Sequence, residues 1–149
     1  MQQLNLPSYP FKIKTEQGKP FIFCSLRKKY VALTPEEWVR QHFAEFLFEK
    51  KDFPKSLTIH EHSISLNNTK KRCDTVAFLS SGKPVVIVEY KAPSVNITQQ
   101  VFDQIARYNI KLRVKYLIVS NGLQHYCCRV DYDTMSYEFL ADIPAYKEL

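Results

Sequence analysis

Glycine is scarce in this chain, and its scarcity argues against one large group of enzymes. Only 3 of the 149 residues are glycine, and Gly18, Gly82 and Gly122 each stand alone between two runs that are typical of strands. The chain has no glycine-rich loop of the kind that cradles nucleotide phosphates, and it lacks the serine elbow of α/β hydrolases. An enzyme acting on a small molecule is therefore the weakest interpretation.

Paired cysteines and long apolar runs are missing as well. The 4 cysteines show no C-x-x-C spacing, so we expect reduced, buried thiols and neither a disulfide framework nor a zinc site. No apolar run approaches the ~20 residues of a membrane span. Residues 1–10 are polar and contain proline, unlike a basic-then-apolar signal peptide. We expect a cytoplasmic protein without a membrane partner.

Positive charge is what the chain has in excess. Its net charge is +6 and its pI is about 9.1. The charge gathers in four clusters, which are Arg27–Lys29, Lys50–Lys51, Lys70–Arg72 and Lys111–Lys115. Such clusters are either solvated faces that protect sheet edges or a track for a polyanion, and composition leaves both open. A hydrophobic content of 45% over 149 residues indicates one folded globular domain.

The strongest pattern is a pair of strands joined by a turn. The first strand, residues 72–79, alternates and presents Asp74 on one face. The second, residues 85–91, opens with four β-branched residues, as strands buried on both faces do. It nevertheless ends with Glu89 and Lys91, which a period of two places on the same face. Charged groups at the end of a buried strand are costly unless they are paired or used.

These charged residues suggest metal-assisted hydrolysis of a phosphodiester. Asp74 and Glu89, on neighbouring strands, are suited to share one hard divalent cation such as Mg²⁺, which takes one or two carboxylates and binds phosphate oxygens. Lys91 would orient the attacking water or stabilise charge in the transition state. The structural alternative is an ion pair of Lys91 with Glu89 or Asp74 at the end of the sheet.

An ordered set of motifs resembles the PD-(D/E)XK nuclease core. The resemblance is closest to the N-terminal nuclease domain of type I restriction enzyme R subunits and spans about residues 27–123. The motifs are Arg27–Tyr30, Leu33–Gln41, Arg72–Asp74, Val88–Pro93, Gln104–Asn109 and Ser120–Gly122. The Glu-x-Lys element alone is weak, whereas the Gln-x-x-x-Tyr element that follows it is an independent mark of this branch.

The resemblance implies a fold and an activity. The fold would be a restriction-endonuclease-like three-layer α/β sandwich, with a mixed central sheet flanked by helices and an N-terminal β-hairpin. It would occupy residues 1–149 as a single domain with a core at about 27–131. The activity would be that of a Mg²⁺-dependent DNA endonuclease, with Mn²⁺ as a substitute, the Tyr90 carbonyl as a third metal ligand, and other restriction-modification subunits as further partners. The ATP-driven translocase of the large R subunits is not carried over to a chain that ends at Leu149.

A helix is expected from Thr34 to about Lys51, because Thr34 can cap it and Pro35 fits its first position. Glu37 would complete a capping box, off the apolar stripe. Glu36 would face the sheet, so we choose Glu36 over Glu37 as the carboxylate that related nucleases add to the metal site. Arg40 and Gln41 are either phosphate contacts or plain surface.

A second helix is expected over residues 97–112, capped by Asn96. Gln104 and Tyr108 lie one turn apart on it, with Tyr108 on the apolar stripe. The resemblance implies that this pair positions DNA or the catalytic lysine, while the plain alternatives are a surface amide and a core aromatic. Arg72, from the basic cluster before Asp74, completes the expected DNA contacts.

Two functions of different classes remain. One is the endonuclease, and the other is a non-catalytic nucleic-acid-binding subunit or regulator on the same fold. A binding module needs the basic surface but has no need for Asp74, Glu89 and Lys91 together. Their joint presence favours the enzyme.

Overall fold

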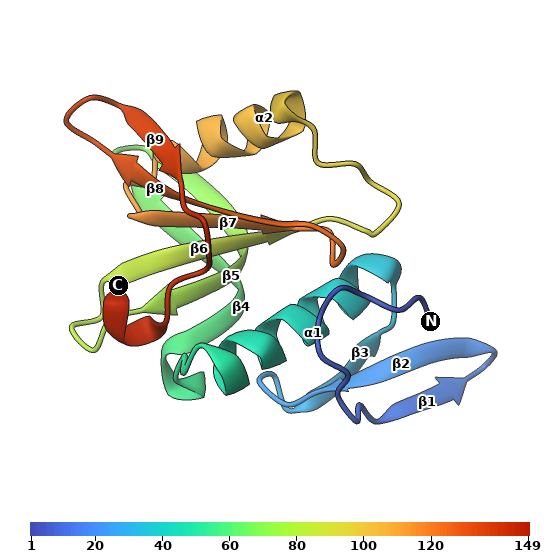
Figure 1. Ribbon diagram of the computed structural model, residues 1–149. Coiled ribbons are helices and arrows are strands. Elements are labelled where there is room, and N and C mark those ends of the chain that lie inside the picture. Colours follow the sequence, from blue (N-terminus) through green and yellow to red (C-terminus); the bar gives the residue numbers. More distant parts are fainter.

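The computed structural model describes residues 1–149 and arranges them mainly in three layers (Figure 1). A six-stranded sheet is the middle layer, helix α1 (Pro35–Lys50) covers one face, and helix α2 (Gln99–Ile110) covers the other. The predicted α/β sandwich with a mixed central sheet is thus confirmed. Neither helix combines the length and the hydropathy needed to cross a lipid bilayer.

Strands of the central sheet lie side by side in the order in which they occur along the chain. β6 and β7 run parallel, and all other neighbours run antiparallel. The crossover between the parallel pair contains α2, as parallel strands require. The strands are β4 (Thr58–Leu66), β5 (Thr69–Phe78), β6 (Pro84–Tyr90), β7 (Tyr116–Ser120), β8 (His125–Asp131) and β9 (Ser136–Phe139).

Strand β6 is anchored on both faces because its alternating side chains enter two cores. Val86 and Val88 belong to the core that contains Phe43 of α1. Ile87 belongs to the core that contains Phe102 of α2. Full burial of one such side chain stabilises the fold by roughly 1.5–3 kcal/mol. The carboxyl end of β6 is therefore held from both sides, which suits it to position functional groups.

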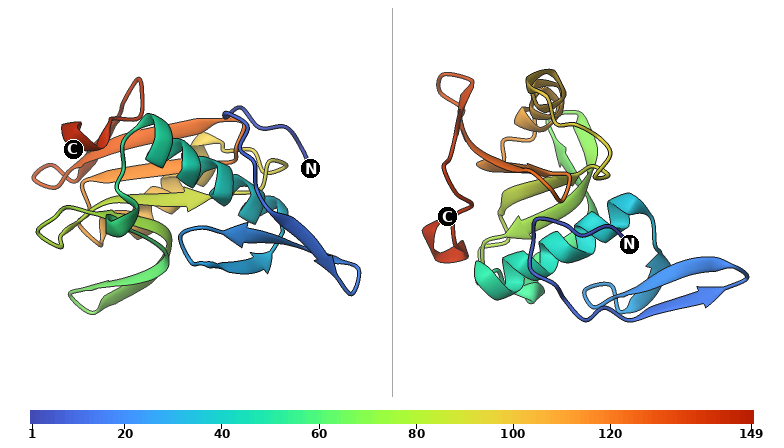
Figure 2. Two further views of the ribbon diagram at one scale, coloured as in Figure 1. Left: turned by 90° about the horizontal axis from the view of Figure 1, so that it is seen from below. Right: turned by 45° about the vertical axis from the view of Figure 1, so that its right-hand side comes forward.

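A separate three-stranded antiparallel sheet precedes α1. It consists of β1 (Ile13–Glu16), β2 (Lys19–Cys24) and β3 (Lys29–Ala32). Figure 2 shows it beside α1 and apart from the six-stranded sheet. The first two strands are the predicted hairpin, whereas β3 was not predicted, because the basic cluster at its start hides its short apolar part.

The helix starts follow the predicted capping chemistry at α1 and depart from it at α2. Thr34 Oγ1 accepts a hydrogen bond from the Glu37 N–H at 3.0 Å, as expected. At α2, however, Thr98 and not Asn96 is the cap, and its Oγ1 accepts from Val101 N–H at 3.2 Å. The helix is accordingly shorter than predicted.

The end of the chain packs back on the domain. It contains the short 3₁₀ helix η2 (Tyr146–Glu148). A second 3₁₀ helix, η1 (Lys55–Leu57), follows α1. Tyr146 donates its backbone N–H to Lys51 O at 2.8 Å and its hydroxyl to Phe78 O at 2.9 Å. The four cysteines are buried and form no disulfide, as predicted.

Strand alternation is interrupted halfway along β4 and β5. Glu61 has a φ of 53°, and the regular pairs skip it, passing from His60–Thr75 to His62–Cys73. Cys73 packs in the same core as Val76, so the strict alternation expected for residues 72–79 does not hold between these two residues. A positive φ on a non-glycine residue redirects the strand and the side chains beyond it.

Candidate metal centre

The residues expected to carry chemistry meet at the carboxyl end of β6, in a hollow of about 400 Å³. Its walls come from the start of α1, the middle of β5, the end of β6 and the side of α2. The lining residues are Glu36, Lys71, Arg72, Asp74, Glu89, Tyr90, Lys91, Val101, Gln104, Ile105, Tyr108 and Asn109. Every residue predicted for the site lines this hollow except Arg40 and Gln41.

Asp74 and Glu89 are neighbours across β5 and β6. Thr75 pairs with Val88 in this antiparallel ladder, so the next pair in register is Asp74 and Glu89. The backbone N–H of Tyr90 also donates to Asp74 Oδ2 at 2.9 Å. Both carboxylates line the same hollow, and one cation can therefore contact both.

Negative charge is crowded in this hollow. Only 8% of Glu89 is exposed, and burial, followed by the nearby Asp74 carboxylate, raises the pKa of Glu89 to about 7. Burial and the Asp74 carboxylate also raise the pKa of Glu36. The Asp74 carboxylate thus makes Glu89 and Glu36 harder to ionise, and a bound cation relieves that repulsion.

Two cations lie against the two carboxylates, and neither is Lys91. Lys71 Nζ donates a hydrogen bond to Glu89 Oε1. Arg40 Nη2 lies 3.7 Å from Asp74 Oδ1. Lys91 fixes its backbone by donating its N–H to Ser120 O at 2.9 Å, while its side chain lines the hollow and forms neither of the ion pairs considered as the structural alternative.

Arg40 and Gln41 require a correction, because both are buried and neither is surface. Only 5% of Arg40 and 3% of Gln41 is exposed. Arg40 Nη1 donates to Glu37 Oε1 at 2.9 Å, and Gln41 Nε2 donates to Glu37 Oε2 at 2.8 Å. Their donors are directed at a buried carboxylate, so they cannot serve as the predicted DNA contacts in this conformation. The Arg40 guanidinium instead lies beside the Asp74 carboxylate.

Glu36 lines the hollow and Glu37 does not, as expected, but the side chain of Glu37 has a different role from the predicted one. Glu36 lines the hollow near Asp74. Glu37 is buried, and its carboxylate accepts from Arg27 Nη2 at 2.7 Å in addition to Arg40 and Gln41. Its side chain therefore joins a buried ion cluster and does not complete the predicted capping box.

The α2 residues lie at the rim. Gln104 and Tyr108 line the main hollow and a shallower one of about 210 Å³ beside it, together with Arg107 and Lys111. Tyr108 is 59% exposed, so it is not a core aromatic. The buried stripe of α2 runs through Phe102, Ala106 and Asn109 instead. Arg72 reaches the same hollow but donates from Nη2 to Glu61 Oε2 at 2.9 Å.

The donor set fits a hard divalent cation with few protein ligands. No group of three or more histidine, cysteine, aspartate or glutamate side chains is positioned to hold a metal. Two carboxylates on adjacent strands and space for water match the way Mg²⁺ is bound. The buried, crowded carboxylates supply the electrostatic reason for a cation to enter.

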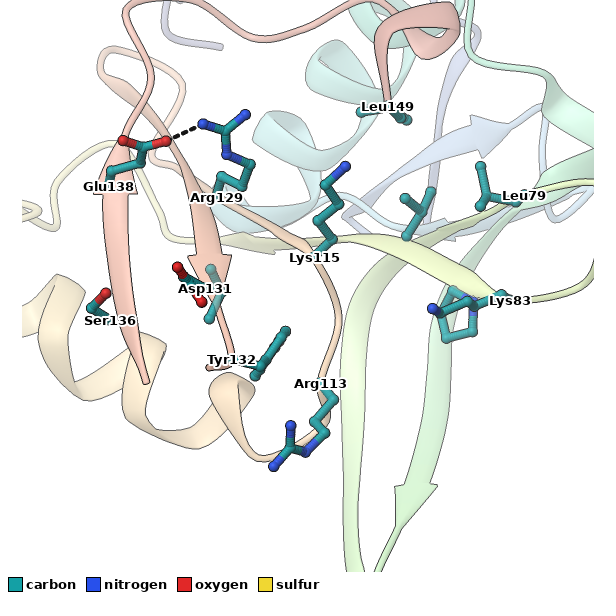
Figure 3. Close-up of a pocket in the computed structure, with 13 residues that line it drawn as sticks. Leu79, Lys83, Arg113, Lys115, Arg129, Asp131, Tyr132, Ser136, Glu138 and Leu149 are labelled. Atoms are coloured by element: carbon teal, nitrogen blue, oxygen red, sulfur yellow. Dashed lines mark hydrogen bonds and ion pairs between the residues drawn. The ribbon is translucent and has the colours of Figure 1, made fainter. Parts of the chain in front are cut away.

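A second hollow, larger than this one, lies elsewhere. It measures about 700 Å³ and lies near the start of β6, at the end of that strand opposite the carboxylates. Figure 3 shows Lys83, Arg113 and Lys115 around it, with Arg129 bound to Glu138. Its basic lining lacks a pair of adjacent carboxylates, so this hollow is unsuited to a divalent cation.

The structure is thus a mixed α/β domain in which carboxylates gather at the end of a central strand. This chain belongs to the family described as Type I restriction enzyme R protein N terminus (HSDR_N), which matches residues 35–144. A solved fragment from Vibrio vulnificus YJ016, assigned as an HsdR subunit of a type I restriction enzyme, shares the fold with a TM-score of 0.54 at 19% identity. The alignment covers 78% of this chain and 24% of that chain. No curated protein matches the sequence.

Proposed function

We propose that this protein is a metal-dependent DNA endonuclease of the PD-(D/E)XK type. The observation that carries the proposal is the meeting of Asp74 and Glu89, from adjacent strands, with Lys91 in one hollow. Membership of the R-subunit N-terminal family supports the nuclease class. The solved HsdR fragment extends well beyond the part that this chain matches, and an assembly with other restriction-modification subunits is part of the proposal.

Mg²⁺, or Mn²⁺ in its place, would be held by Asp74, Glu89 and the Tyr90 carbonyl. When bound, the metal would lower the pKa of a water molecule and stabilise charge on the phosphate. The Tyr90 N–H keeps Asp74 oriented. Glu36 lines the same hollow near Asp74 and would add a carboxylate to the site.

Lys91 has the position and the freedom to act on the attacking water. Its ammonium shares the hollow with both carboxylates without being bound to either. In hydrolysis the water oxygen forms a bond to phosphorus, the bond from phosphorus to the leaving oxygen breaks, and the leaving oxygen gains a proton. Lys91 would orient the water and neutralise the charge that develops on the phosphate.

The DNA strand would enter over α2 and the start of β5. Gln104 and Tyr108 lie at the rim of the hollow, and Arg107 and Lys111 extend the polar surface away from it. Arg72 provides a cation on the other side. Phosphate contacts of this kind position a strand without reading its sequence.

The experiment is a cleavage assay on supercoiled plasmid and on linear DNA with Mg²⁺ or Mn²⁺, repeated with excess chelator. The wild type should nick or linearise DNA only when metal is present. Lys91→Ala should lose activity by at least about 100-fold, the usual contribution of one transition-state donor, and keep its melting temperature. Lys83→Ala, a lysine of the distant hollow, is the matched control and should remain active.

Two other results would contradict the proposal. Equal cleavage by the wild type and Lys91→Ala would point to a contaminating nuclease. DNA binding without cleavage, under every metal tested, would favour the non-catalytic nucleic-acid-binding subunit. That alternative has one observation in its favour, since the Lys71–Glu89 ion pair is able to exist without metal.

A further inference from the structure

Lys71 is bound to a carboxylate that the proposed function assigns to the metal. Its Nζ donates to Glu89 Oε1, and this is the only ion pair of Glu89. The Glu89 side chain is 10% exposed and the Lys71 side chain 26%. A buried carboxylate is stable only with a partner, so in the metal-free protein this ammonium is the counter-ion of Glu89.

Of the three consecutive basic residues Lys70, Lys71 and Arg72, only Lys71 is paired with Glu89, since Arg72 also lines the hollow but binds Glu61. Beyond the interruption at Glu61, Lys71 pairs with the buried Ile64, while Lys70 pairs with the exposed Ser65. Successive side chains point to opposite faces of such a ribbon. Lys71 therefore lines the hollow, whereas Lys70 points to solvent and does not line it.

Of the two cations beside the carboxylates, only Lys71 is able to leave. Arg40 is buried and bound to Glu37, so its guanidinium stays in place. Lys71 has a flexible four-carbon stem and partial access to solvent. A divalent cation and an ammonium at the same carboxylate oxygen repel each other. We therefore expect a metal ion that binds Glu89 Oε1 to displace Lys71 from that oxygen.

We infer that Lys71 is a resident counter-ion that exchanges between Glu89 and the substrate. It occupies Glu89 in the metal-free protein, and it moves to a phosphate oxygen of the bound strand when a divalent cation takes that carboxylate. The inference rests on the proposed function. It makes Lys71 a competitor of the metal and, once displaced, a contact to DNA.

The first test is calorimetric titration of the DNA-free protein with Mn²⁺. Lys71→Met should bind Mn²⁺ roughly fivefold more tightly than the wild type, because a near-surface charge contact is removed from the metal's carboxylate. Lys70→Met removes the same charge one residue away and should stay within about twofold, since exposed charges are screened over about 8–10 Å. An equal gain in both variants would reduce the effect to general electrostatics and overturn the inference, as would an unchanged or weaker affinity in Lys71→Met.

The second test is DNA affinity measured with and without Ca²⁺. Lys71→Met should weaken DNA binding only when Ca²⁺ is present, and there it should lower the salt slope by about one. Loss of affinity to the same degree without Ca²⁺ would contradict the exchange. Lys71→Gln, checked by thermal melting, replaces Lys71→Met should the latter not fold. A wild type that binds no metal would overturn both this inference and the proposed function. A wild type that cleaves DNA while Lys71→Met fails these tests would overturn the inference alone.

Discussion

The backbone N–H of Tyr90 donates to Asp74 Oδ2 at 2.9 Å. The strand that carries Glu89 therefore fixes the carboxylate of the neighbouring strand. Because β6 is clamped between two cores, this bond ties the orientation of Asp74 to the most firmly held part of the fold. Preorganisation of this kind spares a metal site the cost of ordering its ligands when the ion arrives.

The first prediction concerns metal affinity. Asp74→Asn keeps the size of the side chain and its ability to accept from the Tyr90 N–H, but it removes one of the two charges offered to the cation. We expect Mn²⁺ affinity, measured by calorimetry, to fall by at least about tenfold, or 1.4 kcal/mol. Asp142→Asn, an exposed carboxylate bound to Lys51, is the control. An unchanged affinity in Asp74→Asn would remove Asp74 from the site.

The second prediction concerns the stability of the ion cluster behind the site. Arg40→Gln removes the buried guanidinium that lies against both Glu37 and Asp74, and we expect the free energy of unfolding to fall by about 3 kcal/mol, as when one member of a buried pair is lost. Arg72→Gln breaks an exposed pair with Glu61 and should cost under about 1 kcal/mol. Urea denaturation of both variants measures the difference. Similar losses in the two would show that burial does not control the strength of this cluster.

The third prediction concerns pH. Burial, followed by the charges of Arg27 and Arg40, lowers the pKa of His60 to about 3. Below the ordinary histidine pKa of about 6.5 the unfolded chain binds a proton that the folded protein refuses, so stability falls as the pH drops from about 6.5 towards 3. Between pH 7 and pH 5 this group alone should remove roughly 2 kcal/mol of the free energy of unfolding.

His60→Asn removes that proton uptake while keeping a polar partner for Thr75 Oγ1, which lies 2.8 Å from His60 Nδ1. The variant should be less sensitive to acid than the wild type, whatever its stability at pH 7. Urea denaturation at pH 7 and pH 5 gives both slopes. Parallel loss of stability in the two proteins would assign the acid sensitivity to other groups.

The fourth prediction concerns Gly122. Its φ is +85°, and a Cβ added there would lie 2.8 Å from Leu4 Cδ2 and 3.1 Å from Val39 Cγ2. Gly122→Ala should therefore destabilise the protein by about 1–3 kcal/mol, through backbone strain and steric overlap. Gly82→Ala meets no atom within 4 Å and isolates the backbone cost at a similar φ. Thermal melting compares the two variants. Equal decreases in melting temperature would mean that the Leu4 and Val39 side chains move aside without a cost in stability.

The sequence pattern was sufficient to predict the layers of the fold and the proximity of Asp74 and Glu89. A run of β-branched residues is typical of a strand that is buried on both faces, and the order of strands and helices along the chain favoured helices packed on both faces of a mixed sheet. Period-two alternation placed Asp74 and Glu89 near each other because register in a hairpin is set by its turn. Capping chemistry located the start of α1 because Thr34 acts on its own helix.

The partners of those carboxylates were decided only by the tertiary structure. Glu61 has a positive φ within β4, where the pattern assumes regular alternation, and Lys71 of β5 is paired with Glu89. Arg40 is buried beside Glu37 of the same helix, whose carboxylate also accepts from Arg27 in the turn between β2 and β3. Such ion pairs depend on distances between elements far apart in the chain, which no local periodicity encodes.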